Sequence, residues 1–175
     1  MRARCIRTMT VRAVTLLIAV VITFACTSTP TAVKSVASPS PSASGHLGSI
    51  GTAGCKPAAT FHYLGGGTSG FPEAGMDNSR GSIWALFFDA VPPRANQEIK
   101  VVWRMTGAGD FTFRVSDKDG KTVPLVWGPE GHGSSSWNHP GNEVGTGFKF
   151  PHSGCWQIHI AKPAVDADLW LTVAD

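Results

Sequence analysis

The side chains that could do chemistry are concentrated in one stretch of the chain, residues 126–148, which reads VWGPEGHGSSSWNHPGNEVGTGF. Its imidazoles and carboxylates are metal-ligand types, and its indoles and amides are the types that stack on and hydrogen-bond to sugars. A connection of this length between strands is typical of a functional loop. The candidate ligand-binding residues are therefore Trp127, Glu130, His132, Trp137, Asn138, His139 and Asn142.

Three interpretations of residues 126–148 stay open at this point. Trp137 and a histidine plug one end of the domain, or the stretch binds a ligand, or its imidazoles and carboxylates hold a metal ion. The spacing between the two histidines matches no compact zinc motif. The sequence therefore predicts neither a resident metal nor a cofactor. The metal-capable side chains are Glu130, His132, His139 and Glu143.

Nucleophilic and acid–base catalysis find little support in the sequence. Serines follow His132 directly, but the G-x-S-x-G turn is missing, and members of a catalytic triad meet in space rather than in sequence. The glycine run at 65–67 lacks the Lys-Ser/Thr of a phosphate-binding loop. No pair of carboxylates is placed for glycoside hydrolysis. We predict no catalytic residues and no enzyme activity, with an envelope enzyme or metal-handling protein that uses residues 126–148 as the alternative.

Short apolar runs separated by Gly, Pro, Asn and Asp must position this stretch, and none of them has helical periodicity. Residues 82–90 are apolar on both alternations, which predicts a central strand covered on both sides. Residues 98–105 and 111–116 alternate apolar and polar side chains, as half-buried strands do. Residues 65–80, rich in glycine, predict a flexible loop. The sequence thus predicts an all-β sandwich domain over residues 55–175.

The carboxyl-terminal part of the chain carries a family-like pattern. Residues 145–156 follow the pattern GxGFxFPxxGCW, and an alternating strand closes the chain at 169–173. This arrangement resembles the closing strands of immunoglobulin-like and PKD-like sandwich modules, and the carboxyl-terminal part of uncharacterised bacterial lipoproteins. The resemblance implies an immunoglobulin-like β-sandwich of about seven strands, and it implies no activity.

Residues 1–25 predict an export signal. A basic segment precedes the apolar run VTLLIAVVITFA at 14–25, which is shorter than the roughly 20 residues that cross a bilayer as a helix. Ala25 and Cys26 resemble the end of a bacterial lipoprotein signal peptide, although the two preceding residues, Thr and Phe, depart from the usual pattern. The resemblance implies lipid on the sulfur and amine of Cys26, and anchoring at the extracytoplasmic face of the cell membrane. Ordinary secretion is the alternative.

Residues 26–54 predict a disordered tether, because Ser, Thr, Ala, Pro and Gly dominate them and they carry few apolar side chains. Without residues 1–25 the chain has 11 basic and 12 acidic residues, so no basic cluster favours nucleic acid as a partner. The expected partners are the membrane, through Cys26, and an unidentified extracellular ligand or protein. The sequence therefore indicates a lipid-anchored binding or interaction module at the cell surface, with a structural spacer as a further alternative.

Cys55 and Cys155 are the cysteines of the predicted domain, and in an exported protein they predict one disulfide. In the strand that contains Cys155, Trp156, Ile158 and Ile160 share one face, so Cys155 falls on the opposite face. The bridge is then a clasp outside the sandwich core, and it holds the entry of the tether onto a late strand.

Replacement of Cys26 by serine is expected to abolish lipid attachment, because a hydroxyl does not take the place of the thiol that carries the lipid. Metabolic lipid labelling and the intact mass of Cys26→Ser, compared with the wild type, measure this. Unchanged membrane retention of the variant would contradict the predicted anchor.

Overall fold

The computed structural model describes residues 45–52, 54–55, 60–65, 70–133 and 135–175. The predicted signal peptide, Cys26 and the first part of the predicted tether lie outside these residues. The described chain folds into strands and turns, which confirms the all-β prediction. No helix in this part of the chain is long and apolar enough to cross a membrane.

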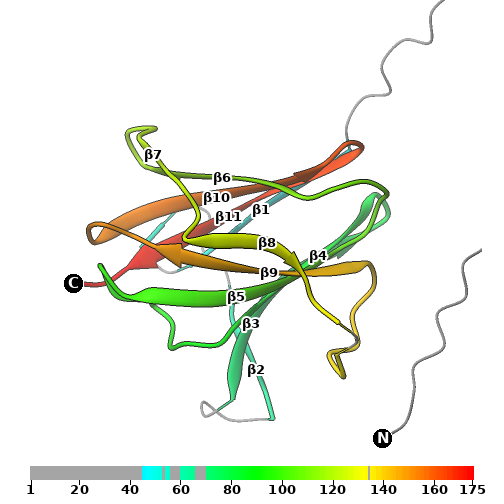
Figure 1. Ribbon diagram of the computed structural model, residues 1–175, viewed down its shortest axis with the longest axis horizontal. Helices are drawn as coiled ribbons and strands as arrows, with labels where there is room; N and C mark the ends of the chain where they lie inside the picture. The colour runs from blue at the N-terminus through cyan, green and yellow to red at the C-terminus, as the bar shows by residue number, and fades with distance from the viewer. Residues whose placement is uncertain (1–44, 53, 56–59, 66–69, 134) are drawn as a thin grey trace, which may run out of the picture. The chain divides into compact units, whose positions relative to one another are not determined.

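The strands form two sheets that pack as a β-sandwich (Figure 1). One sheet has five strands in the order β1-β11-β10-β6-β7, and the other has six in the order β2-β3-β4-β5-β9-β8. The described residues form more strands than the expected seven, partly because the short strands β2, β7 and β8 are included. The five-stranded sheet contains β1 (Gly45–Gly51), β6 (Thr112–Asp117), β7 (Thr122–Val123), β10 (Gly154–Lys162) and β11 (Val165–Val173). The six-stranded sheet contains β2 (His62–Leu64), β3 (Phe71–Asn78), β4 (Gly81–Phe87), β5 (Glu98–Met105), β8 (Trp127–Gly131) and β9 (Asn142–Lys149).

The core lies between the sheets and follows the alternation of their strands. In β10 the side chains of Trp156, Ile158 and Ile160 are fully buried, and β11 opposes them with its own inward residues. In β5 the inward residues are equally buried, and the Trp103 indole Nε1 donates to the Thr146 hydroxyl at 2.7 Å. The strands predicted at 82–90, 98–105 and 111–116 correspond to β4, β5 and β6.

The domain begins earlier than predicted, because residues 45–51 of the expected tether form β1. This strand pairs in parallel with β11 at the edge of the five-stranded sheet. Leu47 and Ile50 are buried in the core, and the His46 Nδ1 lies 2.5 Å from the Asp166 Oδ2 on β11. The partner strand follows 120 residues later in the chain, so the local composition of this segment could not reveal the pairing.

The prediction of a glycine-rich loop at 65–80 is also wrong in part, because residues 71–78 form β3. The glycine within this strand, Gly75, allows close packing and does not make the chain flexible. A Cβ at Gly75 would lie 2.0 Å from the Trp84 ring, so the indole lies directly on the backbone of β3.

Residues 126–148, predicted as one long connection, are mostly a hairpin of β8 and β9. Two register positions show the pairing, Trp127 with Gly147 and Glu130 with Gly145. A Cβ at Gly147 would lie 2.2 Å from the Trp127 Nε1, so glycine again makes room for an indole. Residues 132–141 connect the two strands.

The predicted disulfide is confirmed between Cys55 and Cys155, with 5.6 Å between the Cα atoms. Neither cysteine belongs to the core cluster between the sheets. Cys55 is buried against the outward side chain of Thr172 on β11, whose hydroxyl lies 3.6 Å from its sulfur. The bridge is therefore a clasp on the outer side of the five-stranded sheet, as the strand parity predicts.

Reduction of the disulfide is expected to loosen residues 45–55 before the core melts, because the bridge closes a loop between residues 100 apart. On the chain-entropy model, closing a loop of this length stabilises the folded state by up to about 4.7 kcal/mol. Hydrogen exchange of the Gly45 and Thr52 amides, which bond to Ala164 and Trp170, should speed up while the Ile158 amide stays protected. Global unfolding without an intermediate would contradict this order of events.

Candidate functional site

The connection between β8 and β9 folds over the outer face of the six-stranded sheet. Trp137 is only 7% exposed, and it packs with Leu86 of β4 and Val102 of β5, two apolar residues on the outward side of their strands. The half-buried Trp84 completes this small cluster. The loop is therefore a plug on that face, and Trp137 is its anchor.

A buried carboxylate fixes the indole. Glu73 of β3 is 5% exposed, and its Oε2 accepts a hydrogen bond from the Trp137 Nε1 at 2.5 Å. The same oxygen lies 2.9 Å from the His139 Nε2. The His139 ring stacks on Trp84, with centroids 3.9 Å apart and planes 6° from parallel. Four residues from three parts of the chain thus form one interlocked group.

A second polar group holds the other side of the loop. The Arg104 Nε of β5 donates to the Glu143 Oε2 at 2.7 Å, and its Nη1 donates to the His139 carbonyl at 2.5 Å. The Ser135 hydroxyl donates to the same Glu143 oxygen at 2.7 Å. The His132 Nδ1 lies 2.5 Å from the other oxygen of Glu143. These four side chains therefore hold the loop in place.

The environment of Glu143 favours its charged form. Burial opposes ionisation, but hydrogen bonds from Ser135 and Arg104, the positive charge of Arg104 and a hydrogen bond from His132 outweigh it. The pKa of Glu143 accordingly lies below its usual value of 4.5. The lowered pKa extends to more acid pH the range over which the carboxylate is ionised and ties the loop to β5.

The structure does not bring the sequence-predicted residues together into one site. Trp137, His139 and His132 belong to the plug, Asn138 lines a groove beside it, and Glu130 is exposed on β8. Trp127 lies over Gly147 and donates to Glu98 at 2.8 Å, and Asn142 accepts from Lys162 at 2.9 Å.

The contact of Asn142 belongs to a clamp between the two sheets. The Lys162 ammonium at the end of β10 donates to the carbonyls of Met105 and Gly107 as well, and it lies 4.4 Å from the centre of the Phe111 ring. Lys162 is 4% exposed, and burial lowers its pKa below the usual 10.5. All three ammonium hydrogens have acceptors, so this lysine is structural.

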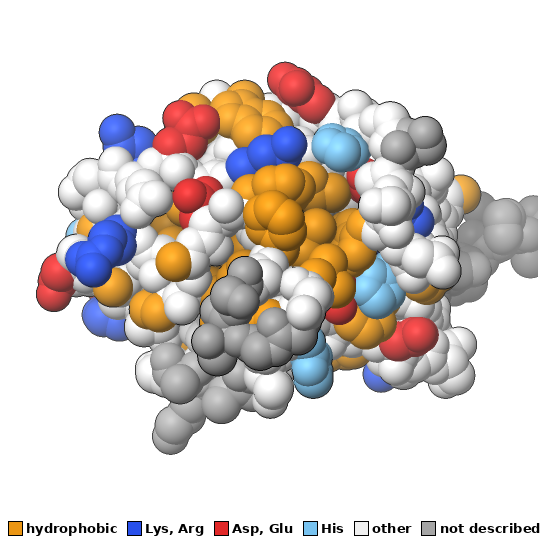
Figure 2. Space-filling view, turned by 90° about the horizontal axis from the view of Figure 1, so that it is seen from below, with side chains coloured by type: hydrophobic (Ala, Val, Ile, Leu, Met, Phe, Trp, Pro, Cys, Tyr) orange, Lys and Arg blue, Asp and Glu red, His pale blue; other side chains and the backbone are white. Residues whose placement is uncertain are grey.

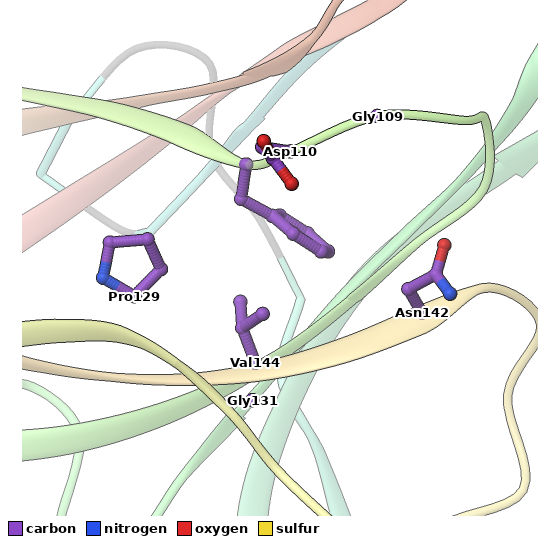
Figure 3. Close-up of a pocket in the computed structure, with 7 residues that line it drawn as sticks. Gly109, Asp110, Pro129, Gly131, Asn142 and Val144 are labelled. Carbon is purple, nitrogen blue, oxygen red and sulfur yellow. The ribbon is translucent and has the colours of Figure 1, made fainter. Parts of the chain in front are cut away.

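An open pocket of about 540 Å³ lies beside this clamp, between the start of β6 and the β8–β9 hairpin (Figure 3). Figure 3 shows Pro129, Val144 and a phenyl ring around the hollow, with Asn142 at one side. The Lys162 amine does not line the pocket. The lining residues are Gly109, Asp110, Phe111, Pro129, Gly131, Asn142 and Val144.

The sequence interpretation missed the exposed ridge, which we define as Leu64, Phe71 and Phe88. These side chains are 38%, 48% and 39% exposed, and the two phenyl centroids are 4.9 Å apart. Figure 2 shows hydrophobic side chains gathered at the centre of one face of the molecule, with basic and histidine side chains beside them. No sequence signal pointed here, because two of the residues flank a glycine-rich segment and Phe88 follows the end of β4.

A groove lies on either side of the exposed ridge. The groove toward the plug has a volume of about 540 Å³ and is lined by Glu73, Leu86 and residues 135–139 among others. The groove on the other side has a volume of about 750 Å³, and Tyr63 and Asp89 contribute to it. All three ridge residues line both grooves. The ridge therefore offers two adjoining hollows of a size typical of ligand sites.

The residues of the ridge lie side by side on neighbouring strands or strand ends, and Lys100 of β5 extends this row. Leu64 is paired in register with Phe71, and Phe88 donates its backbone N–H to the Lys100 carbonyl. The Lys100 ammonium lies 4.6 Å from the centre of the Phe88 ring, an arrangement in which the ring attracts the cation. The outer face of the sheet thus presents an apolar row that ends in a positive charge.

The histidines and carboxylates of the plug are bound in pairs instead of converging on one point. Among the described residues, no group of three or more His, Cys, Asp or Glu side chains is arranged to hold a metal ion.

Comparisons with known proteins leave the family of the chain open. No family model matches the chain, and no curated protein matches it. One solved structure, described as a "Putative Lipoprotein from Bacillus anthracis", is similar over 60% of this chain and 79% of its own, with 16% sequence identity and a TM-score of 0.39. At that distance neither a shared family nor an activity follows from the likeness.

Acid is expected to release the plug through Glu143. Because its pKa is lower in the folded than in the unfolded state, the stabilisation is complete above about pH 4.5 and is lost as the pH falls through the folded-state pKa. Glu143→Gln should be less stable at pH 7 by on the order of 1–3 kcal/mol, and its stability should change less on acidification. Urea unfolding from pH 7 to pH 3 measures both effects.

The matched control for this prediction is Glu130→Gln, which removes an exposed carboxylate of the same hairpin. Its stability and pH dependence should follow the wild type. Parallel pH dependences of Glu143→Gln and the wild type would show that Glu143 does not hold the plug.

Proposed function

We propose that the protein is a lipid-anchored, extracytoplasmic binding module, and that its ligand contacts the exposed ridge and the groove between the ridge and the plug. The observation that carries the proposal is the clustering of Leu64, Phe71 and Phe88, each more than a third exposed, on one face. Single apolar residues are common on protein surfaces, whereas a contiguous apolar patch is typical of an interaction site.

The plug supports this proposal by making the wall of the groove rigid. Trp137 is buried and hydrogen-bonded to Glu73, and Arg104 bonds to both the loop backbone and Glu143. A loop held by these contacts presents Asn138 and His139 to the groove without ordering on binding. A preformed wall of this kind reduces the entropy that binding must overcome.

The alternative functions have less support from the same geometry. His139 is paired with Glu73, and His132 is paired with Glu143. The first pair is also tied to the Trp137 indole, and the second to the Arg104 guanidinium and the Ser135 hydroxyl, so the pairs stabilise the loop and leave few free groups for catalysis or metal handling. A purely structural spacer would not need an apolar ridge on its surface.

Site-specific photo-crosslinking in cells that express the full chain tests the proposal. A benzoylphenylalanine at position 71 or 88 is expected to form a crosslinked adduct with the ligand, because both side chains stand in the ridge. The control position is Lys118, an exposed residue in a turn after β6 of the other sheet. Equal adduct formation at 118 and at the ridge positions, or none at 71 and 88, would overturn the proposal.

A further inference from the structure

We infer that the exposed ridge recognises a polypeptide segment of a partner protein, one that carries apolar side chains for the two grooves and a carboxylate for Lys100. This inference rests on the proposed binding function and names the class of ligand. Three observations carry it: the place of the ridge in the fold, the state of the polar groups around it, and the charge at the end of its row.

The ridge lies at the end of the sheet opposite to the entry of the chain. Gly45 begins β1 next to Arg80, which lies in the turn between β3 and β4. Phe71 is at the other end of β3, and the eight residues of that strand span roughly 25 Å. The described domain therefore begins, at Gly45, away from the ridge. This placement favours a partner outside the anchoring membrane over the membrane itself.

Two carboxylates that line the grooves beside the ridge are already used within the protein. Glu73 accepts a hydrogen bond from Trp137 of the plug, and Asp89 accepts hydrogen bonds from Gln97 and from the Lys100 backbone. The side chains of the ridge itself have no hydrogen-bonding atoms. A sugar would leave the hydroxyls that face the ridge unpaired, whereas apolar side chains of a peptide need no such partners there.

The charge of Lys100 sets the preferred sign of the partner. Its ammonium lies over the Phe88 ring and makes no ion pair with a carboxylate of the described residues. It is thus available to an acidic side chain or a carboxyl terminus next to the apolar contacts. A carboxylate at this position would gain a charge-assisted hydrogen bond at the rim of the apolar contact.

The test uses the full chain purified after export and a random peptide library displayed on phage as the probe. Enriched peptides are expected to carry at least two apolar residues and an acidic group. Phe88→Ser should weaken their binding about tenfold or more, as loss of an anchor does. Lys100→Glu should weaken them as well, and a new selection against this variant should favour basic peptides. Lys118→Glu, on the other sheet, should leave binding unchanged.

Five outcomes would overturn the inference, four of them in the peptide and crosslinking experiments. These four are no enrichment of peptides, enriched peptides that bind Phe88→Ser as well as the wild type, no preference for acidic residues, and crosslinked adducts at position 88 that consist of glycan. Phe88-dependent binding of Cys26→Ser to vesicles of anionic phospholipid would overturn it too, in favour of a membrane. The proposed binding function survives each of these results, since it fails only when the ridge forms no specific adduct.

Discussion

The strict alternation of β10 and β11 is the constraint on which the rest of the fold depends. Their inward side chains are buried between the sheets, so every second residue has to face outward. This places Cys155 where Cys55 can reach it and places Asp166 beside His46 of β1. The amino-terminal segment is therefore attached by contacts on the outer side and edge of the sheet, in addition to its own two buried apolar residues.

The same alternation in the six-stranded sheet creates the candidate site. Leu86 and Val102 point to the outer side, where no further sheet covers them, and Trp137 buries them. Beyond the reach of the plug, Phe71 and Phe88 stay exposed at the end of the sheet. The plug and the exposed ridge thus share one cause. The outer face of the six-stranded sheet has more apolar surface than the loop between β8 and β9 covers.

Two predicted loops, 65–80 and 126–148, include glycines that lie within strands, Gly75 and Gly147. Local patterns take a segment rich in glycine as a sign of a loop, as they did for residues 65–80. In the fold Gly75 and Gly147 lie within strands, because indoles of neighbouring strands rest on their backbones. Whether a glycine gives flexibility or room depends on a neighbour that is distant in the sequence.

The sequence by itself determined the all-β class, the disulfide and the parity that puts it outside the core, since burial of one strand face imposes a period of two. The tertiary structure decided which chemically capable side chains meet. It pairs His139 with Glu73 and Asn142 with Lys162, and it assembles the exposed ridge from three strands or strand ends. Strand order and register bring these residues together, and neither is encoded in a local pattern.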